Sequence, residues 1–186
     1  MNEAIENILN RRSVRVYSDE QIKQEDLDLI LQAGIYAPSA CNSQPWHFTV
    51  VQNKELMNTL NVESKKEFAN SENEHFKALA TNEKYHVFHN APTIIVVSGE
   101  KAALSPEVDC SAAIENMLLA AESLCIGTCW IGLVRFLFKS QREQEFVKML
   151  QIPDGYEPYY AITFGYKKYP NPQPQPRREN KVNYIK

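Results

Sequence analysis

The segment from Ser105 to Leu124 is the feature that most constrains the fold of this chain. Ser105-Pro106-Glu107 is a good helix start, with Ser at the N-cap and Pro in the first turn. The residues that follow are apolar on nearly all sides of a helix, and Gly127 can end it in a left-handed cap. A helix of this kind must be covered, and in a chain of 186 residues a partner subunit is one candidate for the cover.

Four segments have the pattern of β-strands. Residues 46–51 form a first candidate, closed by Asn53, and residues 94–97 are a continuous apolar run typical of a strand buried on both faces. Residues 128–133 and 159–165 complete the set. The longest apolar runs are far shorter than the roughly 18 residues of a membrane span.

Helical patterns alternate with these strands. They cover residues 2–10, residues 27–34 up to Pro38, and a stretch that begins with a capping box at Ser140-Gln141-Arg142-Glu143 and runs to Met149. Residues 54–90 are polar and helical with a ragged apolar pattern, which fits a mobile or solvent-facing region. The order of elements predicts a single α+β domain over residues 1–186, with helices flanking a mixed sheet.

The composition describes a globular protein, with 44% hydrophobic and 23% charged residues. The acidic, helical N-terminus does not have the pattern of a signal peptide, so a cytoplasmic location is the default expectation. The net charge of −3 gives no global reason to expect nucleic acid.

The cysteines stand at positions 41, 110, 125 and 129 and form no Cys-x-x-Cys pair, which argues against a structural zinc site or an iron–sulfur cluster. Disulfides are not expected in a cytosolic chain. Cys125 and Cys129 lie in an apolar stretch, where small buried thiols are the ordinary interpretation.

Two polar segments in the first part of the chain are candidate ligand sites. Arg11-Arg12-Ser13-Val14-Arg15 offers guanidinium groups and a hydroxyl that suit a phosphate and an electron-rich ring edge. Taken alone, a solvated basic patch is the commoner interpretation. The segment 37–46 offers Ser, Asn and Gln side chains on a turn between a helix and a strand, for which ordinary turn chemistry is equally adequate.

Two further candidates lie near the C-terminus. The glycines of the segment 127–132 would let a flat ligand approach the backbone, although a helix cap followed by a buried strand explains them as well. Arg177-Arg178 follows prolines at alternate positions from 170 to 176, so this tail should be extended. A disordered basic tail is the plainer interpretation of the two arginines.

Together and in this order, the segments resemble the nitroreductase family. Arg11-Arg12-Ser13-Val14-Arg15 is similar to its opening Arg-x-Ser-x-Arg/Lys motif, and Ala37-Pro38-Ser39-Ala40-Cys41-Asn42-Ser43-Gln44-Pro45-Trp46 to its Ala-Pro-Ser-x-x-Asn-x-Gln-Pro-Trp segment, the most specific match. The other matches are Asn90-Ala91-Pro92, Asp109, residues 127–132, and Gly165-Tyr166 followed by the prolines and Arg177-Arg178. The resemblance covers nearly the whole chain except residues 54–88.

The resemblance implies an intertwined homodimer with a nitroreductase-like fold and two FMN sites at the subunit interface. The tail from about residue 167 to 186 would extend over the partner subunit. It also implies an oxidoreductase that passes a hydride from NADH or NADPH through N5 of FMN to a nitroaromatic, a quinone or a similar flat acceptor, with ping-pong kinetics. No side chain would be a catalytic nucleophile, and neither a metal, nor nucleic acid, nor a membrane is expected as a partner.

Carried over residue by residue, the resemblance implies that Arg11 and Ser13 hold the FMN phosphate, with Arg12 beside them. Arg15 would lie near the pyrimidine edge of the ring, where a positive charge stabilises the anionic reduced flavin. Arg177, with Arg178 as the alternative, would reach the phosphate through the extended tail.

The resemblance also assigns two backbone-rich segments. Pro38, Ser39, Ala40 and Asn42 would come from the other subunit to cover the dimethylbenzene end and the ribityl side. Many relatives have Ser where Ala40 stands, so one hydrogen bond is expected to be missing. Backbone groups of Trp130, Ile131 and Gly132 would meet the isoalloxazine ring, with one donor to N5. Gln44, Trp46 and His47 are interpreted as structural.

Two hypotheses from other functional classes stay open. A flavin-binding sensor or FMN reservoir would use the same arginines without appreciable oxidation of NAD(P)H. A phosphate- or RNA-binding module would use the terminal arginines, but the negative net charge and the lack of an aromatic and basic stripe count against it.

Overall fold

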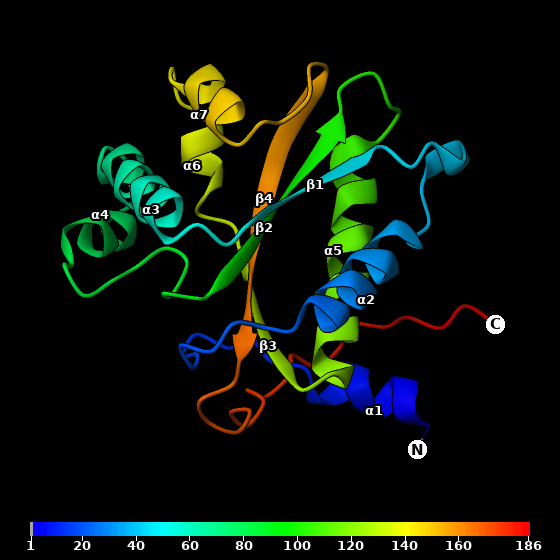
Figure 1. Cartoon of the computed structure of the whole chain (residues 1–186). Coiled ribbons are helices and arrows are strands. Elements are labelled where there is room, and N and C mark those ends of the chain that lie inside the picture. The colour runs from blue at the N-terminus through cyan, green and yellow to red at the C-terminus, as the bar shows by residue number, and fades with distance from the viewer. Residues whose placement is uncertain (1) are drawn as a thin grey trace.

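The computed structural model describes residues 2–186 and has helices on both faces of a central sheet (Figure 1). Its elements are α1 (Glu3–Asn10), α2 (Gln24–Ile35), the short 3₁₀ turn η1 (Ala40–Asn42), β1 (Trp46–Val51), α3 (Lys54–Ala69), α4 (Glu74–Thr81), β2 (Thr93–Glu100), α5 (Pro106–Ser123), β3 (Ile126–Ile131), α6 (Arg135–Phe138), α7 (Glu143–Met149) and β4 (Tyr156–Tyr166).

The sheet has the order β1-β2-β4-β3, and every neighbouring pair of strands is antiparallel. The expectation of an α+β fold is confirmed, but the strands do not form the mixed sheet that was predicted. The crossover through α5 does make β2 and β3 run in the same direction, but β4 lies between them and opposes both. Parallel pairing does occur at an isolated bridge between Ser13, which lies outside the named strands, and Thr128 of β3.

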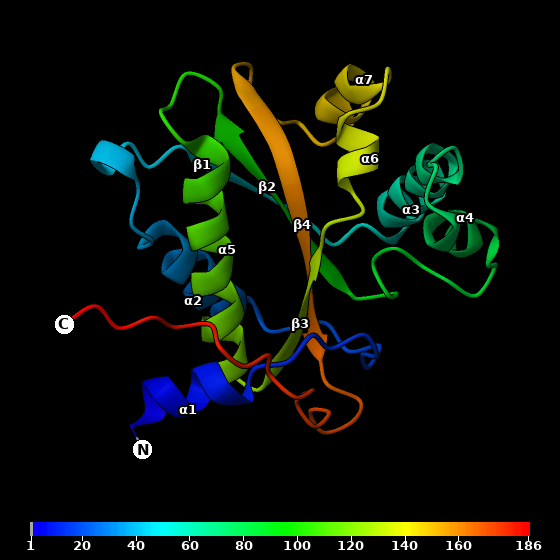
Figure 2. The same ribbon diagram turned by 180° about the vertical axis from the view of Figure 1, so that it is seen from behind.

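The residues of β2 explain why two helical layers are present. Ile95 and Val97 pack against α2 and α5, whereas Ile94 and Val96 face the cluster formed with α3, α6 and α7. All four side chains are essentially inaccessible to solvent, which confirms the strand buried on both faces. Figures 1 and 2 show α2 and α5 on one face of the sheet and α3, α4, α6 and α7 on the other.

The helix predicted after Ser105 is confirmed as α5, but the rest of the chain buries only part of its surface. Its buried face includes Ile114 and Met117, whereas Val108 keeps 69% of its surface exposed. The predicted cap at Gly127 is wrong, because Cys125 takes the left-handed conformation with φ of 60° and Gly127 lies within β3. Cys125 is also exposed rather than buried.

Gly127 is needed for a different reason. A Cβ at this position would come within 2.8 Å of Cγ1 of Val14, so a glycine lets the N-terminal segment lie directly against β3. The same residue type is favoured by a left-handed cap and by close approach of two backbones, and the sequence pattern does not separate the two.

Two other local predictions need correction. Ser140 does not cap a helix, because its hydroxyl accepts from the Arg142 N–H while α7 begins at Glu143 without a side-chain cap. The region 54–90 is more deeply packed than its polar sequence indicates. Met57, Leu60 and Phe68 of α3 are buried at helical spacing.

The tail after β4 has no helix or strand among its described residues. Asn171 donates to the carbonyl of Asn10 at 3.0 Å and to Glu122 at 2.7 Å, which holds the start of the tail beside α1 and α5. Beyond that point the chain runs outward past α5, as Figure 2 shows. In residues 2–186, no helix combines the length and the hydropathy needed to cross a membrane.

Candidate functional site

The N-terminal basic segment is fixed across one end of the sheet. The Val14 N–H donates to the Thr128 carbonyl at 2.8 Å, and the Ser18 N–H donates to the Tyr166 carbonyl at 2.9 Å. Tyr17 is buried between these bonds, with its hydroxyl 2.7 Å from that of Thr163. The segment around Val14 and Ser18 therefore rests on β3 and β4.

The arginines of this segment differ in how firmly they are held. Arg12 donates through Nη1 to the carbonyls of Leu9 and Arg11, both at 2.7 Å. In contrast, Arg11 makes one long ion pair of 3.6 Å with Glu115, and the exposed Arg15 makes one long hydrogen bond of 3.4 Å to the Ser13 carbonyl. Arg11 and Arg15 thus keep most of their donors available, whereas Arg12 is engaged with the backbone.

The segment meets β3 at Cys129. Burial raises the pKa of the Cys129 thiol, and Arg15, the Ser13 hydroxyl and Arg11 act in the opposite direction. The Ser13–Thr128 bridge and the bond from the Val14 N–H to the Thr128 carbonyl hold the basic segment against this part of β3. The structure therefore brings together two motifs that are far apart in the sequence.

Gly132 follows β3 and leaves the backbone open. A Cβ built there would have no heavy atom within 4 Å, so neither packing nor a positive φ explains a glycine. The residue borders a cavity of about 780 Å³, whose lining also includes Glu67, Phe76, Leu133, Arg135, Phe136, Lys139 and Ser140. The rings of Phe76 and Phe136 meet edge to face at 5.5 Å. This aromatic wall beside open backbone suits a flat ligand.

Tyr85, from the region that had no sequence match, packs against the core cluster that contains Cys129, and His89 directly follows that region. Their rings meet edge to face at 6.1 Å. Burial lowers the pKa of His89 to about 4, with further effects of Arg15 and His86. Burial also raises the pKa of Tyr85, and the charges of Cys129 and Arg15 act on it too.

Sequence reasoning missed both residues because the ragged pattern of residues 54–90 gave no position for them. One signal was present. His89 and Asn90 have φ of 53° and 52°, and both residue types are enriched in this left-handed region. A His-Asn pair directly before Ala91-Pro92 could have indicated an ordered turn next to β2.

The segment 38–42 does not join this site within one chain. The Ala40 N–H donates to Oδ1 of Asp109 at 3.1 Å, so η1 lies beside the first turns of α5. Ser13 instead lies beside β3, after the other end of that helix (Figure 1). Pro38, Ser39, Ala40 and Asn42 are therefore separated from the basic segment.

The remaining predicted residues take different positions. Trp130 is half-buried, with its ring 5.1 Å from that of Tyr160, and Ile131 is buried, so both offer their backbone rather than their side chains. Arg177 and Arg178 are exposed in the tail and form no hydrogen bond or ion pair with the described part of the chain.

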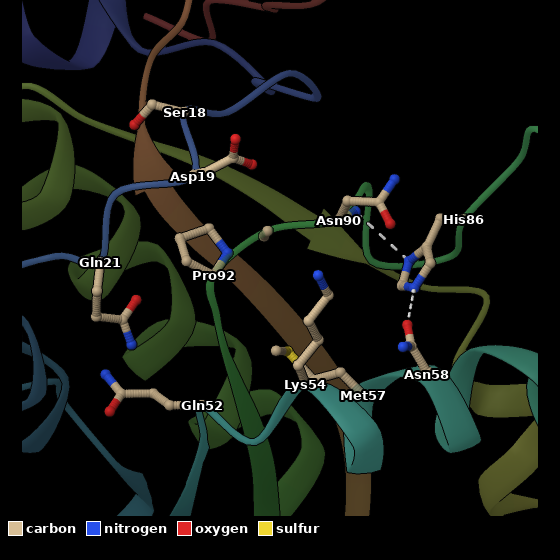
Figure 3. Close-up of a pocket in the computed structure, with 11 residues that line it drawn as sticks. Ser18, Asp19, Gln21, Gln52, Lys54, Met57, Asn58, His86, Asn90 and Pro92 are labelled. Carbon is tan, nitrogen blue, oxygen red and sulfur yellow. Dashed lines mark hydrogen bonds between the residues drawn. The ribbon is translucent and has the colours of Figure 1, made fainter.

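A polar hollow of about 730 Å³ lies between the N-terminal segment, the start of α3 and the residues before β2 (Figure 3). In it, Nδ1 of His86 accepts from the Phe88 N–H at 3.1 Å, and its Nε2 lies 3.4 Å from Oδ1 of Asn58. None of the residues predicted to bind a cofactor lines this hollow, and most of its polar side chains are exposed.

Comparisons with known proteins give one consistent family. The model of the nitroreductase family matches residues 8–166. A protein of Archaeoglobus fulgidus with the provisional name NADH dehydrogenase/NAD(P)H nitroreductase is 36% identical over 172 residues, covering 90% of this chain and 87% of its own length. A nitroreductase with bound FMN from Bacteroides fragilis has a TM-score of 0.91 at 35% identity, and one from Desulfitobacterium hafniense has 0.90 at 32%; each comparison covers 100% of both chains.

Proposed function

This chain belongs to the nitroreductase family, and we propose that it is an FMN-dependent oxidoreductase that uses NAD(P)H to reduce flat, electron-poor acceptors such as nitroaromatics and quinones. One observation carries the proposal. The segment that carries Arg11 and Arg15 is bonded to β3 through Val14 and Thr128, and the open backbone of Gly132 directly follows that strand. Phosphate-binding chemistry and space for a planar ring are thus joined in one place.

The residues fit FMN group by group. Arg11 and Ser13 would hold the phosphate, with Arg12 beside them, because guanidinium groups bind phosphate through charge-assisted hydrogen bonds. Arg15 would lie at the pyrimidine edge, where its positive charge raises the reduction potential of a bound flavin. The backbone of Trp130, Ile131 and Gly132 would face the ring.

FMN, when bound, supplies the hydride chemistry between NAD(P)H and the acceptor. The protein would bind the cofactor, orient the substrate beside it and shield both from water. The rings of Phe76 and Phe136 would pack against a flat substrate and exclude water from the cavity beside Gly132. Since this one cavity would serve both substrates in turn, we expect ping-pong kinetics.

The site is completed by a second copy of the chain. Ile5, Ile8 and Leu9 of α1 are about half exposed, and Val108 of α5 is 69% exposed, which leaves apolar surface uncovered on both helices. The segment 38–42 lies away from the basic segment of its own chain, so it would cover the flavin of the partner. The tail carrying Arg177 would extend across the partner as well, and residues 1–186 would act as one domain.

The visible spectrum of the purified protein, followed by anaerobic addition of NADH or NADPH, tests the proposal. A yellow protein that bleaches and recovers with a quinone or nitroaromatic supports it. A yellow protein that does not bleach favours the second candidate, an FMN-binding sensor or reservoir. A protein that stays colourless after incubation with FMN contradicts both. Light scattering at micromolar concentration should give the mass of a dimer.

A further inference from the structure

The carboxylate of Asp109 is buried in an unusual way. The residue is 5% exposed and lies in the first turns of α5. Its Oδ1 accepts from the Ala40 N–H at 3.1 Å, while its Oδ2 is buried and accepts no hydrogen bond from the described residues. Within residues 2–186, no cationic side chain forms an ion pair with it. Burial of a carboxylate oxygen without a donor costs stability, so another requirement must retain the residue.

The bond from Asp109 ends on a strained turn. Cys41, Asn42 and Gln44 have φ of 53°, 54° and 47°, although none is a glycine. Each residue in this region costs about 1 kcal/mol or more, and such strain persists only where the surroundings hold it. Inside the turn, the Gln44 N–H donates to the Ser39 hydroxyl and the Gln44 side chain donates to Asn42.

These internal bonds cannot fix the turn relative to the rest of the molecule. Among the described residues, the bond between Ala40 and Asp109 is the one hydrogen bond that joins the segment 38–44 to another element. The turn projects beyond the sheet beside the start of α5, as Figure 1 shows. The ends of the segment are held at Ala37 and Pro45, whose carbonyl accepts from the Glu100 N–H at 2.8 Å, and Asp109 holds the turn between them.

We propose that Asp109 is a positioning residue for the cofactor of the partner subunit. It holds the Ala40 N–H and so presents the turn 40–42, already in its strained conformation, to the FMN bound by the second copy of the chain. This inference rests on the proposed function. Because the turn is ordered before binding, the cofactor does not have to order it, which increases the affinity for FMN.

Two variants remove the bond from opposite sides. Asp109→Ala removes the acceptor. Ala40→Pro removes the donor, and it fits the backbone because Ala40 is the first residue of η1 and Ser39 is already extended, with φ of −141° and ψ of 155°. Asp109→Asn keeps a carbonyl acceptor for the same N–H. Ser111→Ala is the matched control, since among the described residues the Ser111 hydroxyl bonds only within α5, to the Glu107 carbonyl.

The measurements are the FMN dissociation constant of the dimer, from quenching of flavin fluorescence, and the melting temperature of the apoprotein. Asp109→Ala and Ala40→Pro should each raise the dissociation constant about tenfold, as expected for the loss of one well-placed hydrogen bond. Asp109→Asn and Ser111→Ala should stay within twofold of the wild type. The apoprotein of Asp109→Ala should melt within a few degrees of the wild type, because removal of a buried oxygen without a donor offsets the lost bond.

Wild-type affinity in both Asp109→Ala and Ala40→Pro would overturn this inference while leaving the proposed function intact. If Asp109→Ala fails to fold, Ala40→Pro decides alone, since its change is confined to the turn and leaves the buried helix α5 unaltered. A folded Ala40→Pro protein with unchanged affinity then overturns the inference. A wild-type protein that binds no FMN overturns the proposed function as well.

Discussion

The two basic segments of this chain carry the same residue type but have different structures. Arg11 and Arg15 belong to a segment that is hydrogen bonded to β3 and buried at Val14 and Tyr17. Arg177 and Arg178 lie in the exposed part of the tail, beyond the bonds of Asn171, and form no hydrogen bond with the rest of the described chain. A cluster of arginines in a sequence therefore does not show whether the rest of the fold holds it in place. Only the cluster that is held in place can form part of a preformed binding site within one subunit.

The backbone explains the contrast. The N-terminal segment has backbone N–H groups to donate: that of Val14 bonds to the Thr128 carbonyl, and that of Ser18 bonds to the Tyr166 carbonyl. The tail has proline at alternate positions from 170 to 176, and proline has no N–H to donate. The tail cannot form a regular ladder with its own sheet, but seven residues of extended chain span roughly 22 Å. That reach suits a contact on another subunit, and the following predictions separate the two roles.

The largest effect is expected for Arg15→Ala. Loss of a charge-assisted hydrogen bond should raise the FMN dissociation constant roughly 10- to 100-fold and lower the flavin's reduction potential. Fluorescence titration and an anaerobic redox titration measure the two effects. Arg142→Ala is the matched control, because Arg142 pairs with Glu63 and Glu145 and does not line the cavity beside Gly132. If neither quantity changes in Arg15→Ala, the assignment to the pyrimidine edge is wrong.

A smaller effect is expected when the anchor of the N-terminal segment is weakened. Tyr17→Phe removes a buried hydroxyl that donates to the Val14 carbonyl and lies 2.7 Å from Oγ1 of Thr163. The loss should lower the free energy of unfolding by about 1–2 kcal/mol, which urea denaturation of the apoprotein would measure. Tyr184→Phe, on the exposed tail, is the control and should have no measurable effect. Equal stability of both variants would contradict the claim that the segment is anchored through Tyr17.

The fold was largely predictable because its signals are local. The strand predicted at residues 46–51 coincides with β1, and the apolar run at 94–97 lies within β2. Period and turn residues are sufficient for such elements. The mixed sheet was wrong because strand order is a long-range property. The insertion of β4 between β2 and β3 has no local signal.

The candidate site was predictable only where a motif is contiguous. Arg11, Ser13 and Arg15 lie together in the sequence, and the structure bonds their segment to β3 at Thr128. Tyr85 and His89 lie in the stretch between α4 and β2, which has no apolar periodicity, so no periodic pattern could assign them. The bond between Ala40 and Asp109 likewise joins residues that are 69 positions apart. Contacts of this kind come from packing, which the sequence specifies only through the whole fold.

Substitution of a single arginine in the tail should change the affinity for FMN less than Arg15→Ala does. Arg177→Ala should raise the FMN dissociation constant about 5- to 10-fold, because an exposed and freely extended arginine loses part of its binding energy in becoming ordered. Arg178→Ala should change it less than twofold and is the internal control. The melting temperature of the apoprotein should be the same for both variants. A larger effect of Arg178→Ala would reassign the phosphate contact by one residue.

The smallest effect concerns the pH dependence of the free energy of unfolding. It distinguishes the basic segment at residues 11–15 from the tail in the absence of the cofactor. Burial, with added effects of Arg15 and His86, lowers the pKa of His89 from 6.5 to about 4. The unfolded chain therefore binds more protons than the folded chain in this interval, and this part of the stability is present above pH 6.5 and is lost as the pH falls towards 4. In Arg15→Ala the pKa of His89 should rise, since one source of its depression is gone.

The free energy of unfolding of Arg15→Ala should therefore fall less steeply than that of the wild type between pH 6.5 and 4, as measured by urea denaturation of the apoprotein at several pH values. Burial also lowers the pKa of His47 and His86, so the difference between the two profiles, rather than either profile alone, isolates His89. Arg177→Ala should have the wild-type profile, because its charge lies in the exposed tail. Identical profiles for Arg15→Ala and the wild type would mean that the Arg15 guanidinium does not lie beside His89.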